Sequence, residues 1–154
     1  MQQTKICVET VSRANPSDVF RLLRDGSTWP RWSLFDAFQL EREGSADPLG
    51  VGAIRVFSTR VSRAREEVVE IIRDRRFSYV LLSGLPLNDY RADVELIPMP
   101  CGGTTIHWQS TYHPRHRALS WFWRWFMTKI LRDVGWQLAR AAEDPELVAL
   151  AEKA

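Results

Sequence analysis

Residues 117–142 have the sequence RALSWFWRWFMTKILRDVGWQLARAA, in which apolar side chains recur every three or four positions. This recurrence matches the 3.6-residue turn of an α-helix and not the two-residue repeat of a strand. The segment therefore predicts a long helix over residues 117–142. The face that we expect this helix to turn toward the core consists of Leu119, Trp123, Phe126, Met127, Ile130, Val134, Leu138 and Ala141.

The region before this helix, residues 37–113, has the alternating pattern of short antiparallel strands separated by turn residues. Residues 89–97 and 104–113 alternate most regularly, so that each has one apolar and one polar face. The breaks between the apolar segments predict about six strands. The strands around Arg55 and residues 66–72 remain undecided, because both of their faces contain apolar residues.

The ends of the chain supply the remaining elements. Residues 4–13 alternate like a half-buried strand, and residues 15–26 predict a short helix that Asn15 or Ser17 caps and Gly26 ends. A second short helix or turn is expected over residues 28–35, and a brief closing helix over residues 146–153.

Together these elements predict one α+β domain over residues 1–154. We expect a helix-grip fold, in which a curved antiparallel sheet of about seven strands wraps around the long C-terminal helix. Two short helices follow the first strand. A length of 154 residues agrees with a single core, since domains typically have ~100–200 residues.

Composition limits the classes of function. The chain has 21 Lys and Arg against 19 Asp and Glu, so its net charge of +2 gives no reason to expect nucleic acid as a partner. Two cysteines are too few for a disulfide framework, and the N-terminus lacks the apolar core of a secretion signal. We therefore expect a cytoplasmic protein. The most apolar stretch, residues 119–131, is too short to span a bilayer.

Four stretches carry a resemblance to a known family: SRANPSDVFRLLRDGSTWPRWS (12–33), the pair Gly50 and Gly52, REEVVEIIRDRRFSYVLLSGLP (65–86) and GGTTIHWQSTYHP (102–114). The chain resembles the START-like (SRPBCC, Bet v 1-like) superfamily, in particular small bacterial polyketide cyclase/dehydrase and lipid-transport proteins. This resemblance implies a deep cavity between the sheet and the long helix for an apolar or amphipathic small molecule. It also implies alternatives, since some members are aromatase/cyclases and others are cochaperones.

The inner rows of the predicted elements supply the candidate ligand-binding residues. These rows would serve equally to line a cavity or to plug the interior with aromatic rings, and the resemblance favours a cavity that binds a lipid, polyketide or quinone-like molecule. Hydroxyl and indole groups in the rows need a polar partner if they are buried. The candidate cavity residues are Trp32, Phe35, Phe77, Tyr79, Leu81, Tyr90, Ala92, Val94, Trp108, Ser110, Tyr112, Trp123, Phe126 and Ile130.

The sequence contains no catalytic motif of the common hydrolase, phosphate-binding or zinc-protease types. Arg55 could hold an anion, and Glu67 or Glu70 could face the cavity in one register, but all three also fit solvated strand positions. Asp36 is equally ambiguous, so we assign no catalytic residue, although a polyketide aromatase/cyclase remains an alternative function.

No cofactor is implied, and the histidines do not point to a metal. His113 and His116 are three positions apart, but no neighbouring acid or thiolate completes a metal shell, so we expect no metal site. His107 shares a strand face with polar residues and is expected to be a surface histidine.

The opposite side of the long helix carries what we call the outer Trp face, made of Trp121, Trp125, Arg132 and Trp136. The surrounding sequence is basic, since no Asp or Glu occurs between Leu96 and Arg132. We expect this face to form a homodimer interface or to pack beneath residues 145–154. Transient docking on an anionic membrane and plain solvent exposure, with an arginine stacked on an indole, are the alternatives.

Overall fold

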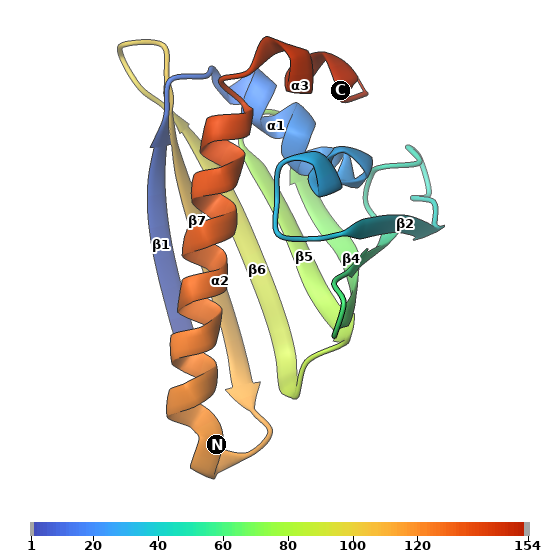
Figure 1. Ribbon diagram of the computed structural model, residues 1–154, viewed down its shortest axis with the longest axis vertical. Helices are drawn as coiled ribbons and strands as arrows, with labels where there is room; N and C mark the ends of the chain where they lie inside the picture. The colour runs from blue at the N-terminus through green and yellow to red at the C-terminus, as the bar shows by residue number, and fades with distance from the viewer. Residues whose placement is uncertain (1, 153–154) are drawn as a thin grey trace.

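A computed structural model describes residues 2–152 of the chain. Seven strands, three α-helices and two 3₁₀ helices (labelled η) follow one another along these residues (Figure 1). In chain order they are β1 (Thr4–Ser12), α1 (Pro16–Arg24), η1 (Gly26–Arg31), β2 (Ala37–Arg42), β3 (Ile54–Ser58), β4 (Arg63–Ile72), β5 (Arg76–Ser83), β6 (Leu87–Pro98), β7 (Thr104–Pro114), η2 (Arg117–Leu119), α2 (Ser120–Ala141) and α3 (Pro145–Leu150).

The strands form one antiparallel sheet with the order β1-β7-β6-β5-β4-β3-β2. Strands β2 to β7 pair as a continuous meander, and β1 returns to the edge of the sheet beside β7. The sheet curves around α2, which crosses its concave side (Figure 1). The predicted helix-grip fold and the six strands expected between residues 37 and 113 are confirmed, with β7 ending at Pro114.

Helices α1 and η1 close one end of the curved sheet (Figure 1). The Asn15 side chain caps α1 by accepting a hydrogen bond from the backbone N–H of Asp18 (2.9 Å), as its position predicted. The second helix is shorter than expected and begins at Gly26, which was predicted only to end the first. A Cβ at Gly26 would lie 2.3 Å from the ring of Phe38, so a larger residue would have to displace that ring.

Helix α2 buries Met127, Leu131, Val134 and Leu138 against the sheet and α1, largely as its periodicity predicted. Leu119 was wrongly placed on the core face, since it lies in η2 and is 47% exposed. The 3₁₀ turn changes the angular step between residues, so the periodicity of α2 does not extend back to this position. Helix α3 ends at Leu150, and the predicted end at Lys153 lies outside the described residues.

The two regular strands behave as predicted. In β7, and in β6 from Tyr90 to Leu96, every second side chain is buried, including Ala92, Val94 and Trp108. Strand β4 is irregular, because its register against β5 shifts between Arg65 and Glu66 and again between Val68 and Glu70. No helix within residues 2–152 is both long and apolar enough to cross a membrane.

Candidate ligand-binding cavity

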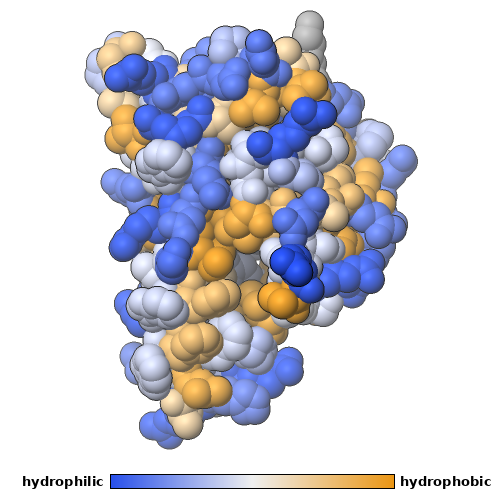
Figure 2. Space-filling model, in the orientation of Figure 1, coloured by the Kyte–Doolittle hydropathy of each residue, from blue (hydrophilic) through white to orange (hydrophobic). Residues whose placement is uncertain are grey.

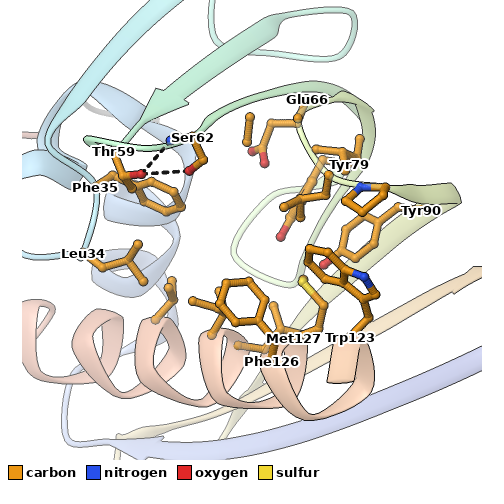
Figure 3. A pocket seen from close by; sticks show the side chains of 18 of the residues that line it. Leu34, Phe35, Thr59, Ser62, Glu66, Tyr79, Tyr90, Trp123, Phe126 and Met127 are labelled. Carbon is orange, nitrogen blue, oxygen red and sulfur yellow. Dashed lines mark hydrogen bonds between the residues drawn. The ribbon is translucent and has the colours of Figure 1, made fainter. Parts of the chain in front are cut away.

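A cavity of about 410 Å³ lies between the concave face of the sheet and α2. Strands β4 to β7 contribute one wall, α2 contributes the opposite wall, and the segment after η1 contributes Leu34 and Phe35 (Figure 3). A hollow beside α2 with apolar side chains at its rim is visible on the surface (Figure 2). The interior therefore contains open space, and aromatic rings do not fill it completely.

Many of the predicted residues come together in this lining, from three strands, α2 and the segment after η1. The predicted residues that line the cavity are Phe35, Tyr79, Leu81, Tyr90, Trp108, Trp123, Phe126 and Ile130. The others lie outside the lining, although Phe77, Ala92, Val94, Ser110 and Tyr112 are buried in the core and Trp32 packs against it. Trp32 donates its indole N–H to Thr28 Oγ1 (3.1 Å) and Phe77 lies under the guanidinium of Arg55.

Aromatic hydroxyls and indoles give the cavity its sparse polarity. Burial raises the pKa of Tyr79 and of Tyr90, so both hydroxyls keep their protons at neutral pH and can donate as well as accept. No residue between 2 and 152 provides a hydrogen-bond partner for the indole N–H of Trp123. The cavity is thus largely apolar with a few polar groups, which is the usual character of a small-molecule site.

One charged pair stands in this apolar wall. Arg55 on β3 lies directly opposite Glu66 on β4 in the sheet register, so both side chains project from the same face. Arg55 donates from Nε (3.0 Å) and from Nη2 (2.5 Å) to the same oxygen, Glu66 Oε1. Its third nitrogen, Nη1, donates to the carbonyl of Leu23 (2.9 Å). Glu66 itself is part of the cavity lining (Figure 3).

Aromatic rings enclose the guanidinium of Arg55. Its central carbon lies 5.2 Å from the ring of Trp29, 4.9 Å from that of Phe57 and 4.8 Å from that of Phe77. Arg55 is only 1% exposed. Burial raises the pKa of Glu66 above its ordinary value, although the neighbouring Arg55 acts in the opposite direction. The pair is a desolvated unit of the interior.

These contacts correct the interpretation of the charged candidates. The expectation that Arg55 is a solvated strand residue is wrong. Glu67 contacts Arg42 (3.4 Å) and Glu70 contacts Arg76 (2.9 Å), and both remain partly exposed, so neither faces the cavity. Asp36 is exposed, next to Phe35 of the lining.

The carboxylate that does reach the cavity, Glu66, was missed. The bulges in β4 destroy the simple alternation that would have assigned its face. Its spacing from Val68, which is fully buried, was a usable signal, because residues two apart in a strand share a face. Trp29 and Met127 in the lining were also absent from the predicted site, although Met127 was predicted to face the core.

The histidines lie away from the cavity lining. His107 Nδ1 is 3.1 Å from Glu9 Oε1 on the outer face of the sheet, which agrees with the predicted surface position. His113 Nδ1 is 3.6 Å from Asp89. Within the described part of the chain, His, Cys, Asp and Glu form no group of three that could hold a metal ion.

The outer Trp face is uncovered. Trp121 is 70% exposed, and Trp125 and Trp136 are each 58% exposed. The expectation that residues 145–154 cover these indoles is wrong for the described residues, because α3 contacts α1 and η1 instead. Arg140 stacks on Trp136 at 5.9 Å. Pale and orange side chains extend along the N-terminal half of α2 (Figure 2).

A seven-stranded antiparallel sheet gripping a C-terminal helix around a cavity defines the Bet v 1-like class of fold. The chain belongs to the polyketide cyclase/dehydrase and lipid transport family, whose model matches residues 3–143. No curated protein sequence matches the chain.

Solved structures share the fold at low sequence identity. The protein XoxI from Bacillus cereus has a TM-score of 0.69 at 18% identity, over 95% of this chain and 99% of its own. Ara h 8.0201 has a TM-score of 0.70 at 16% identity, over 96% of this chain and 99% of its own. A protein from Nitrosospira multiformis has a TM-score of 0.67 at 16% identity, over 93% and 98% of the two chains.

Proposed function

We propose that this protein binds and carries a hydrophobic or amphipathic small molecule, of the lipid, polyketide or quinone-like kind, in the cavity between the sheet and α2. The observation that carries the proposal is the open volume of about 410 Å³ in a place where a stable fold would otherwise pack side chains. Protein interiors are normally packed as densely as organic crystals, so an internal space of this size weakens the fold. Membership of a family described by lipid transport supports the same function.

A titration with the apolar dye N-phenyl-1-naphthylamine tests this function. We expect a saturable rise in dye fluorescence with one dye per protein. Ala64→Trp places an indole in the cavity and should abolish the rise, because Ala64 belongs to the lining on β4. Ala118→Trp adds the same indole at an exposed position of η2 and should leave the titration unchanged. Equal binding by both variants, or none by the wild type, would contradict the proposal.

For the outer Trp face we propose a contact between two copies of the chain. The spacing along α2 supports an antiparallel pairing of the two helices about a point between Ile130 and Leu131. In that arrangement Trp125 of each copy lies opposite Trp136 of the other, and Trp121 lies opposite Arg140, which suits cation–π contact. Such a self-complementary contact would bury indoles that are otherwise exposed.

Light scattering after size-exclusion chromatography tests the contact. The wild type should have about twice the 17.8 kDa mass of one chain, and Trp125→Glu should have the mass of a single chain. Trp32→Phe, a change at the end of η1, is the matched control and should keep the larger mass. A single-chain mass for the wild type, with binding to vesicles rich in phosphatidylserine, would replace the dimer with the membrane alternative.

We also propose a cytoplasmic location. Cys7 and Cys101 are both free and exposed, which suits a reducing compartment, where thiols persist. Labelling of intact and lysed cells with a membrane-impermeant maleimide tests this location. The two thiols should react only after lysis. Reaction in intact cells would place the protein outside the cytoplasm.

A further inference from the structure

The two carboxylate oxygens of Glu66 have different surroundings. Both donors that Arg55 directs at this side chain, Nε and Nη2, end on Oε1. No side chain or backbone N–H of residues 2–152 donates to Oε2. The carboxylate points into the cavity, and Tyr79 lies along the same wall (Figure 3). One strong acceptor is therefore left available to whatever occupies the cavity.

Stability does not account for this pair. A buried ion pair gains little net free energy over an apolar pair of similar volume, because both charges lose their hydration. Residues 55 and 66 are directly opposed across β3 and β4, a position where two apolar side chains would pack well. A role in ligand binding therefore explains the pair better than a role in stability.

Arg55 holds Glu66 in a fixed position. Its Nη1 is tied to the Leu23 carbonyl, and the three rings of Trp29, Phe57 and Phe77 surround its guanidinium. A carboxylate fixed in this way loses little conformational freedom when a ligand binds, so the hydrogen bond that it accepts contributes more fully to affinity.

The charges of Arg55 and Glu66 determine which polar group a ligand can place beside Oε2. Arg55 neutralises Glu66, so the pair offers a ligand no net charge to attract. A carboxylate or sulfonate on the ligand would place its negative charge against Oε2 and lose its hydration, which is unfavourable. A neutral hydroxyl, in contrast, supplies the donor that Oε2 lacks, while its apolar remainder contacts Tyr79, Phe126 and Ile130.

We propose that the ligand of this cavity is an apolar alcohol or phenol whose hydroxyl donates a hydrogen bond to Glu66 Oε2. This inference rests on the proposed binding function and narrows its ligand class. Glu66 acts as a specificity-determining residue, and Arg55 acts as the residue that positions it. Ligands that present only acceptors, such as ethers, or a negative charge, such as carboxylates, bind less tightly.

Calorimetric titration with three matched probes tests this specificity: 2-naphthol, 2-methoxynaphthalene and 2-naphthoate. The wild type should bind the naphthol at least about tenfold more tightly than the methyl ether, as expected for a hydrogen bond to a charged acceptor. The naphthoate should bind more weakly than either. Binding of none of the three overturns the cavity function itself, whereas equal affinities overturn only the hydroxyl preference.

Glu66→Gln replaces the hydrogen-bond acceptor Oε2 with a hydrogen-bond donor. The amide oxygen can still accept from Arg55, which leaves an NH₂ donor directed at the cavity. The ratio of the affinity for 2-naphthol to the affinity for 2-methoxynaphthalene should fall to about one or below. Glu70→Gln on the same strand is the matched control, since Glu70 contacts Arg76 on the outer face, and it should keep the wild-type ratio.

The double variant Arg55→Met/Glu66→Leu covers the case in which Glu66→Gln does not fold. It replaces the ion pair with apolar side chains and leaves no buried charge behind. We expect it to bind 2-methoxynaphthalene within about threefold of the wild type and to show no preference for the naphthol. A wild-type preference that persists in this double variant would overturn the assignment of Glu66.

Discussion

The two faces of the sheet use the same kinds of charged residue in opposite ways. On the outer face, Arg76 contacts Glu70 (2.9 Å), Asp93 (3.0 Å) and Glu95 (2.7 Å), and all four side chains retain contact with solvent. On the inner face, a single arginine contacts a single glutamate inside the apolar wall of the cavity. The outer cluster keeps much of its hydration, whereas the inner pair has lost nearly all of it.

The outer cluster and the inner pair therefore differ in what they contribute to stability. A solvated network contributes modestly to stability and tolerates the loss of one member. A desolvated pair contributes little as a unit, but removal of one partner leaves an uncompensated charge in the interior. The inner pair is therefore costly to break and of little structural benefit to keep, which is the behaviour expected of residues retained for binding.

Arg55→Met should have the largest effect. It leaves the Glu66 carboxylate buried without its partner, and we expect the free energy of unfolding to fall by about 3–5 kcal/mol. Urea unfolding followed by tryptophan fluorescence measures the loss. The double variant Arg55→Met/Glu66→Leu should recover most of it. If Arg55→Met is as stable as the wild type, the inner pair is solvated, and the two faces of the sheet do not differ in this respect.

Asp93→Asn should have a smaller effect, because Asp93 belongs to the outer cluster. Burial alone would raise the pKa of Asp93, but hydrogen bonds from Ser78 (2.6 Å) and Arg91 (3.1 Å) and the charge of Arg76 outweigh it and lower that pKa. We expect a loss of about 1 kcal/mol in the free energy of unfolding at pH 7.

The pH dependence of this loss checks its origin. A folded-state pKa below the unfolded value gives stability that is fully present above the unfolded pKa. That contribution disappears as the pH falls through the folded pKa. The difference between wild type and Asp93→Asn should therefore shrink on acidification. A constant difference between pH 7 and pH 3 would mean that the carboxylate charge is not what stabilises the outer face.

Glu66→Gln should give a pH signal of the opposite sign. Burial raises the folded pKa of Glu66, so protonation during acidification relieves a penalty that the unfolded chain does not have. The wild type should gain stability relative to Glu66→Gln as the pH falls through the raised pKa. Urea unfolding of both proteins across the acidic range measures this trend, and a relative loss for the wild type would contradict it.

The sequence predicted the regular part of the sheet well and the irregular part poorly. In β6 and β7 the alternation identified the inner row, because no bulge interrupts the period of two between Arg91 and Pro98. In β4 two register shifts interrupt it, so the pattern indicated Glu67 or Glu70 where the structure has Glu66. A one-residue slip reverses the face of a side chain, which is why the error fell on the charged residue of the site.

The cavity itself was beyond the reach of the sequence pattern. Alternation assigns a side chain to the inner face, but it does not say which part of that face lies over open space. Val94 and Tyr112 therefore share a face with Tyr79 and Trp108 and yet are buried outside the lining. The distance between α2 and the sheet decides this, and it depends on the packing of the whole fold.

The tryptophan side chains allow the most direct measurement of the cavity account. Trp29, Trp108 and Trp123 line the cavity, whereas Trp121, Trp125 and Trp136 lie on the outer Trp face. In ¹H–¹⁵N spectra of the indole groups, titration with 2-naphthol should shift the signals of Trp29, Trp108 and Trp123 and leave the three outer signals in place. Shifts confined to the outer indoles would place the ligand on the surface and contradict the account.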